Sequence, residues 1–424
     1  MSRSQRALLI ALGTDNLGSG LFLPLALVYA TRVVGLPLGA AGSLIALGTL
    51  AGLAVPPAAG QLVDRAGPRL VVICAQLLQA AGALTYLLAH SAGQVLAAAI
   101  LLSAGQQMFY SSLFALIADV SVAGPRDRPF AIAGMVRSAC FGFGGLIIAV
   151  MLASVGTAGY RIAVAADAAS FLACALLLTA WVRIPPPAGH RAGLAARRGS
   201  GRVLADRAFL ALIAVNGLGA IGTDIFLTGM PVYVLVRLHG PAWLPGTILA
   251  LLTGLTSVAG TVALRLAGRR SRIAVLQAGA AMFVAWSAAA LAAAIVPRSW
   301  RAAELLAATV LLAAASLLYS RANAVAEAAA PAAQRGRYLA AFQYSYGVAG
   351  VLAPAVVALF SVALWLPWLI GAASAGLAII ALRVLARHLP PQAVWPQPAE
   401  PPATSEPAAA RAGGDGASAR DSAH

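Results

Sequence analysis

Residues 60–69 read GQLVDRAGPR, a short charged stretch set between two long apolar runs. The run before it begins at residue 38 and the run after it ends at residue 90. Each is long enough to cross a bilayer, which takes about 20 apolar residues. Gly67 and Pro68 interrupt the apolar pattern and favour a turn at this point. The stretch therefore indicates a chain that crosses a membrane and turns back.

The composition of the whole chain excludes an ordinary soluble fold. Of its 424 residues, 61% are hydrophobic and 10% are charged, with a mean hydropathy of +0.86, whereas soluble domains carry roughly 25% charged residues. The net charge of +16 resides in arginines that lie between the apolar runs. Membrane topology explains this charge better than a polyanionic ligand does, so we expect a lipid bilayer and no nucleic acid as partner.

Apolar runs broken by Gly, Pro and charge predict an all-α membrane protein with twelve transmembrane helices. Residues 183–206, rich in Pro, Gly and Arg, predict a cytoplasmic linker between a six-helix bundle over 1–182 and a second over 207–388. Residues 389–424 lack the apolar content to pack and are predicted to form a disordered cytoplasmic tail. The predicted helices cover residues 7–30, 38–63, 69–90, 94–119, 130–153, 159–182, 207–236, 243–267, 272–296, 302–326, 338–362 and 364–388.

The distribution of arginine predicts the orientation, because basic residues in short loops stay on the cytoplasmic side. With the N-terminus inside, most loop arginines fall on the cytoplasmic side. Both termini are therefore expected in the cytoplasm, in a multi-pass protein of the plasma membrane. The arginines left on the outer side are Arg32, Arg161, Arg237, Arg298 and Arg301.

A weak internal repeat supports duplication of one bundle. Residues 115–147 align without a gap on residues 323–355, and both segments contain an acidic residue, a short Arg-bearing loop and then a Gly-rich helix. Duplicated bundles are a common plan among transporters. The matched landmarks are Asp119 with Glu327, Phe130 with Tyr338, and Gly142 with Gly350.

The loop GQLVDRAGPR resembles the motif G-x-L-x-D-R-x-G-x-R of the major facilitator superfamily, between helices 2 and 3. The resemblance covers about residues 7–388 and is closest to the drug and metabolite exporters. It implies two bundles related by a pseudo-two-fold axis, a substrate site between them, and alternating access. It also implies a cytoplasmic gate formed by Gly60, Leu62, Asp64, Arg65, Gly67 and Arg69, with Asp119 and Glu327.

Ionisable residues inside spans cost about 2.5 to 3.5 kcal/mol each on insertion scales and therefore need a reason. Asp224, nearest the middle of a span, is the first candidate for a proton-carrying group. Asp15 is the second, although a structural carboxylate hydrogen-bonded within its bundle is an equal alternative. Arg137 is the third, because it precedes glycines in a way that looks like the antiporter pattern of helix 5. Asp167 is expected to form a structural pair with Arg161 or a neighbouring helix.

Polar side chains in the apolar spans predict a substrate cavity suited to amphipathic molecules. Hydrogen bonding between helices is at least as good an explanation for any one of them. For Arg321, snorkelling to the membrane interface is the alternative to anion binding. The cavity candidates are Asn16, Gln106, Gln107, Tyr110, Thr223, Arg321, Gln343 and Tyr344.

Two departures from the antiporter pattern weaken the prediction of proton antiport. The Gly-Pro pair expected in helix 5 is absent, and helix 4 offers Gln106 and Gln107 where a basic residue is usual. Close helix packing is the favoured explanation for Gly142, Gly144 and Gly145.

The sequence favours a transporter over an enzyme. It contains no GxxxxGK[ST] motif and no His pair or Cys cluster with metal-ligand spacing, so we expect no cofactor and no metal. The leading hypothesis is proton-coupled efflux of a small amphipathic compound by a monomer. Nutrient uptake by symport and a transport-inactive membrane sensor are the alternatives.

Overall fold

A computed structural model describes residues 3–120, 127–182, 205–267, 270–331 and 334–395, and every regular element in these ranges is a helix. Eleven described helices are long and apolar enough to cross a membrane, and Leu244–Ala259 forms a shorter apolar helix. The all-α membrane fold is therefore confirmed. The count of twelve spans, the domain boundaries and the cytoplasmic location of the termini stay predictions.

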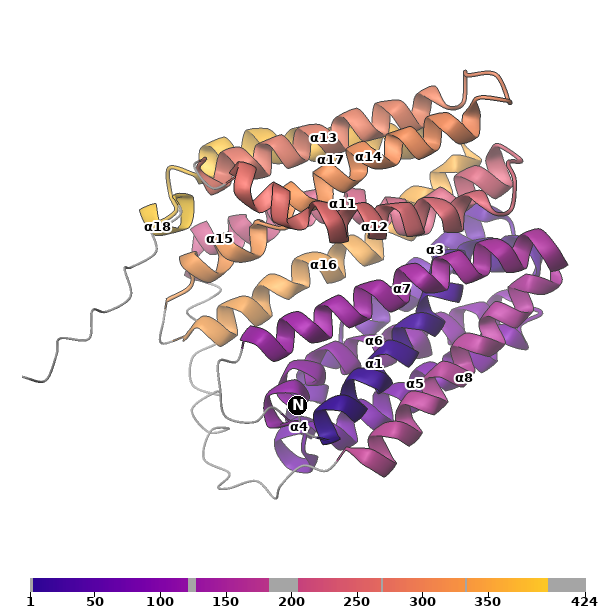
Figure 1. Cartoon of the computed structure of the whole chain (residues 1–424), viewed down its shortest axis with the longest axis horizontal. Helices are drawn as coiled ribbons and strands as arrows, with labels where there is room; N and C mark the ends of the chain where they lie inside the picture. The colour runs from indigo at the N-terminus through magenta and orange to yellow at the C-terminus, as the bar shows by residue number, and fades with distance from the viewer. Residues whose placement is uncertain (1–2, 121–126, 183–204, 268–269, 332–333, 396–424) are drawn as a thin grey trace, which may run out of the picture.

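The first group of helices packs around α1, which contacts both α7 and α8, while α5 contacts α6 and α8 (Figure 1). Proline starts several of these helices, because its fixed φ suits the first turn and its missing N–H is not needed there. Its elements are α1 Arg3–Phe22, η1 Leu23–Leu25, α2 Ala26–Arg32, α3 Leu38–Gly52, α4 Val55–Ala66, α5 Pro68–Leu87, α6 Ala92–Val120, α7 Asp127–Val155 and α8 Ala158–Trp181.

The second group packs around α11, which contacts α16 and α17, and around α13, which contacts α14 and α17. In Figure 1 this group lies above the first. Its elements are α11 Arg207–Pro231, the π-helical η2 Val232–Arg237, α12 Leu244–Ala267, α13 Arg272–Ala292, α14 Arg301–Tyr319, α15 Ala322–Ala329, α16 Arg335–Ala358, η4 Leu359–Ser361, α17 Leu366–Leu385 and α18 Pro391–Val394.

Two helix pairs make the most extensive contacts between the groups: α3 packs on α16, and α7 packs on α12. Smaller contacts link η1 and α2 to α11 and η2. Glycine allows both helix pairs to approach closely. A side chain on Gly42 of α3 would press on Ala358 of α16, and one on Gly246 of α12 would overlap the carbonyl oxygen of Gly145. These residues lie at the ends of the helices that the arginine distribution predicts to be outside, which we call the outer end.

The glycines of α7 serve close packing. Gly142 and Gly145 face Thr253 and Leu249 of α12, and Gly144 abuts the backbone of α1. Any side chain at these positions would overlap the partner helix. Packing therefore accounts for them without a bend in α7, which runs unbroken over Asp127–Val155.

Several predicted single helices are broken. The helix predicted over 7–30 is interrupted by the 3-10 turn η1, which contains Pro24. The helix predicted over 207–236 changes to a π-helix after Pro231. The helix predicted over 302–326 ends at Tyr319, and a separate helix, α15, begins at Ala322. Proline removes a backbone donor and crowds the preceding turn, which explains the first two changes. Hydropathy is blind to such breaks because the residues on both sides are equally apolar.

A short helix lies at the start of the segment 389–424 that the sequence predicts as a tail. Pro391–Val394 form α18, and Ala393 is buried. Arg272 Nη1 donates to the carbonyl of Gln392 at 2.9 Å, which ties this turn to α13. Residues 396–424 and most of the predicted linker, 183–204, lie outside the described residues.

Candidate functional site

Arg137 lies on α7, five residues into the span Ile132–Val155, and α6 holds its guanidinium. Its Nη2 donates to the hydroxyl of Tyr110 at 2.7 Å. Its Cζ also lies 5.0 Å from the ring centroid of Tyr110 and 6.0 Å from that of Phe109, within the range of cation–π attraction. The aromatic pair therefore fixes the position of a cation inside the membrane.

Asp15 lies inside the first bundle, 5% exposed. Its Oδ1 accepts from Gln76 Nε2 of α5 and its Oδ2 accepts from Asn16 Nδ2, both at 3.0 Å. Asn16 also donates to the carbonyl of Leu12. Both candidates are thus engaged in hydrogen bonds within the bundle, which is the structural alternative that the sequence left open.

Asp224 has a different environment. It lies near the middle of the 31-residue span Arg207–Arg237 and is half-buried. Gly222 and Phe226 of the same helix pack on α13, and Asp224 lies about 200° further round the axis than Gly222, on the opposite face. Among the described residues, its carboxyl group has no hydrogen-bond or ion-pair partner.

The second bundle contains two polar contacts that the sequence analysis missed. Asn216 Nδ2 of α11 donates to Ser345 Oγ of α16 at 2.7 Å, and Asn216 Oδ1 is buried without a partner in the described structure. The hydroxyl of Tyr346 lies 3.5 Å from Asn323 Oδ1 of α15. A single amide in the apolar run LALIAVNGLG was the only signal for Asn216.

The other cavity candidates divide by the face on which they lie. Gln106 and Gln107 are half-buried. The side chain of Gln107 reaches the other bundle, because its Nε2 lies 3.6 Å from the position that a Cβ atom on Gly347 of α16 would take. Gln343 is exposed on the same face of α16 as Tyr346, one turn away. Thr223 is also exposed and Arg321 is half-buried.

Tyr344 is the exception among these candidates. It is 40% exposed and shares a helix face with Val348 and Leu352, four and eight residues further on, which are exposed too. An exposed apolar stripe at this spacing is typical of a lipid-facing surface. We therefore leave Tyr344 out of the site.

Arg32 joins the two bundles at the outer end. Its Nη2 donates to the carbonyl of Leu235 at 2.6 Å. Leu235 lies in η2, where the π-helical turn follows Pro231. The π-helical turn thus presents one of its backbone carbonyls to an arginine of the other bundle.

The predicted gate motif forms the turn between α4 and α5. Arg69 Nε and Nη2 donate to the carbonyls of Leu178 and Thr179, at 3.1 and 2.5 Å, in the last turn of α8. A cation at a helix C-terminus complements the helix dipole. The side chain of Asp64 lies outside the described part of the chain, and the gating role of the motif stays a prediction.

The remaining acidic residues predicted to have a role are Asp119, Glu327 and Asp167. Asp119 and Glu327 are exposed near helix ends. Asp167 is 2% exposed in α8, and its Oδ1 has no hydrogen-bond partner in the described structure. Of the two partners expected for Asp167, Arg161 or a neighbouring helix, Arg161 is exposed, and the described residues show no contact between it and Asp167.

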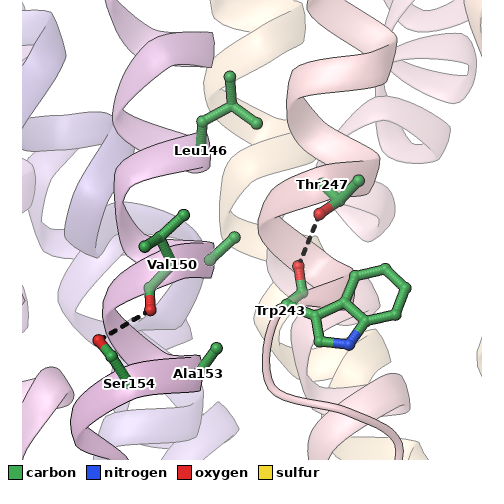
Figure 2. Close-up of a pocket in the computed structure, with 7 residues that line it drawn as sticks. Leu146, Val150, Ala153, Ser154, Trp243 and Thr247 are labelled. Carbon is green, nitrogen blue, oxygen red and sulfur yellow. Dashed lines mark hydrogen bonds between the residues drawn. The ribbon is translucent and has the colours of Figure 1, made fainter.

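A hollow of about 420 Å³ lies between the outer parts of α7 and α12, away from these polar residues. Figure 2 shows its apolar wall, with Trp243 on one side and Val150 on the other. The hydroxyls of Ser154 and Thr247 are turned to their own helix carbonyls at 3.0 and 2.9 Å. This surface offers little polar recognition, so we place the candidate site at the polar residues between the bundles.

Residues 8–296 match the Major Facilitator Superfamily. The chain belongs to this superfamily. No curated protein matches the sequence. Among solved structures, this superfamily member resembles the nucleoside transporter NupG, with a TM-score of 0.75 and 12% identity over 90% of this chain and 99% of that one.

Two further solved structures share the fold of this superfamily member. One is a POT family transporter in complex with 5-aminolevulinic acid, with a TM-score of 0.71 and 11% identity over 92% of this chain and 96% of that chain. The other is a bacterial homolog of the human lysosomal transporter Spinster, inward-facing, with a TM-score of 0.65 and 16% identity over 91% and 95%. The family and these neighbours indicate a transporter and not an enzyme.

Proposed function

We propose that this protein is a proton-coupled secondary transporter that exports a small amphipathic organic compound across the plasma membrane. The unpaired carboxyl group of Asp224 carries the proposal, because it lies near mid-span on the face of α11 opposite the contacts with α13. A charged carboxylate inside a membrane costs about 2.5 to 3.5 kcal/mol. Binding a proton removes this cost, which couples protonation to movement of the helix.

Alternating access is supported by where the bundles meet. Arg32 and the glycine contacts of α3 and α12 join them at the outer end, while Gln343 and Tyr346 remain exposed further along α16. This arrangement is the one expected of a carrier open to the cytoplasm. Opening to the outside requires these outer contacts to break.

Asp224 is preferred to Asp15 as the proton carrier for a geometric reason. Both oxygens of Asp15 accept hydrogen bonds from amide side chains of its own bundle. Releasing or binding a proton there would disturb a buried network. Asp224 has no such partners among the described residues, so its protonation state is free to change during a cycle.

The test is transport by purified protein in proteoliposomes under an imposed pH gradient, with a panel of amphipathic compounds. The wild type should move at least one compound against its gradient, and Asp224→Asn should abolish that coupling. Glu304→Gln, in the first turn of α14, is the matched control and should transport normally. Coupling retained by Asp224→Asn and lost by Asp15→Asn would contradict the assignment. The direction of movement separates export from uptake, which the same fold serves.

A further inference from the structure

Arg137 is a cation within a membrane span that makes no salt bridge among the described residues, although the carboxyl group of Asp15 is near enough to interact with it electrostatically. The acid of α1 in the same bundle, Asp15, takes its hydrogen bonds from Gln76 and Asn16. Arg137 itself has a single described hydrogen bond, to the Tyr110 hydroxyl, and its Nε is buried without a partner. Five N–H donors in a planar fork are therefore mostly unused.

The angular position of Arg137 on α7 indicates that its side chain points towards the space between the bundles. Val136 and Cys140 pack on Gly13 of α1, while Gly142 and Gly145 pack on α12. Arg137 falls on the arc between these two contact faces. The exposed apolar residues that would meet lipid, Met135, Phe143 and Val150, fall on the other arc of the helix.

Small residues leave room beside the guanidinium. Gly134 lies one turn before Arg137 on this arc, and a Cβ there would meet nothing within 4 Å. Ser138, which lies towards the α12 face of the helix, is exposed. The rings of Phe109 and Tyr110 cover one side of the guanidinium and hold it in place. The result is an oriented cation with unused donors, an open position one turn away at Gly134 and an aromatic wall.

We infer that the transported compound is an organic anion whose carboxylate binds Arg137 while its apolar body lies against the aromatic wall. This inference rests on the transport function proposed above and adds the charge of the substrate. Arginine suits a carboxylate because its fork can donate two parallel hydrogen bonds. A carboxylate would also supply a hydrogen-bonded counter-charge, which Asp15 does not give because its oxygens accept from Gln76 and Asn16, and so offset the desolvation of the guanidinium.

The test uses matched probes that differ in charge and hardly in shape, such as 4-phenylbutyrate and 4-phenylbutyramide, with further pairs of aromatic carboxylates and their amides. The readout is the ligand-induced rise in the unfolding temperature of purified protein in detergent. Carboxylates should stabilise the wild type and amides should not. Arg137→Gln should weaken carboxylate binding at least tenfold, which corresponds to about 1.4 kcal/mol. Arg298→Gln, in an exposed outer loop, is the matched control and should bind as the wild type does.

Arg137→Lys keeps the positive charge but cannot donate two parallel hydrogen bonds to one carboxylate, so it should bind carboxylates with intermediate affinity. This variant keeps the inference testable if Arg137→Gln fails to fold. Equal stabilisation by carboxylates and amides, unchanged binding in Arg137→Gln, or no stabilisation by any carboxylate would overturn the inference. Proton-driven transport of neutral or cationic compounds that survives Arg137→Gln would overturn it as well, while leaving the transport function standing. If carboxylates bind at Arg137 but no compound is transported under a gradient, the anion site is supported and the proposed transport function is contradicted.

Discussion

Gly67 determines whether the turn between α4 and α5 can form. Its φ of 81° and ψ of 155° lie in a region that is open to glycine and strained for other residues. We predict that Gly67→Ala destabilises the protein by about 1 to 3 kcal/mol. The strain should appear as a lower midpoint in SDS-induced unfolding of the purified protein.

Gly60, in the same motif, is the matched control for this substitution. It lies within α4, and a Cβ there would meet nothing within 4 Å. Gly60→Ala should leave the midpoint unchanged or raise it, because alanine is the better helix former by about 0.5 to 1 kcal/mol. Equal losses in both variants would show that the motif, and not the conformation of Gly67, is sensitive to added side chains.

At the scale of elements, the contact between α7 and α12 depends on the absence of side chains. Gly246 lies against the Gly145 carbonyl and Ala149. Gly246→Val should separate the two helices and cost about 1 to 3 kcal/mol, the usual range for overpacking. Heat-induced unfolding in detergent measures this loss. Gly254→Val changes an open position of the same helix, with nothing within 4 Å of its Cβ, and should unfold at the wild-type temperature.

At the scale of the whole molecule, Arg32 holds the two bundles together at the outer end. A hydrogen bond from a charged donor contributes about 1.5 to 3 kcal/mol, and 1.4 kcal/mol is a tenfold change in an equilibrium. Arg32→Gln should therefore shift the population towards separation of the outer ends by about tenfold or more. Arg237→Gln is the matched control, since Arg237 is exposed and has no partner in the described structure.

The shift is measurable by double electron–electron resonance between spin labels at Thr157→Cys and Arg298→Cys. Both positions are exposed in outer loops, one in each bundle, and Cys74, Cys140 and Cys174 would be replaced by serine. Arg32→Gln should add a population at longer distance. A distance distribution identical to that of the wild type would show that the bundles stay closed without this contact.

The sequence was sufficient for the class of fold and for the location of the helices. Hydropathy indicated the spans, because a bilayer requires about 20 apolar residues per helix, and the stretch GQLVDRAGPR indicated the family. Asp224 was also identified from the sequence alone, as an ionisable residue in an apolar run. Such features are local, so they can be read without knowing which helices meet.

The tertiary structure decided what each side chain does. It paired Asp15 with Gln76, Asn216 with Ser345 and Arg32 with the Leu235 carbonyl, all far apart in the sequence. It also placed Tyr344 on an exposed, largely apolar face of α16. A bilayer accepts an apolar helix at any rotation about its axis, so hydropathy sets where a helix crosses the membrane. Packing against the other helices sets the direction in which its few polar residues point.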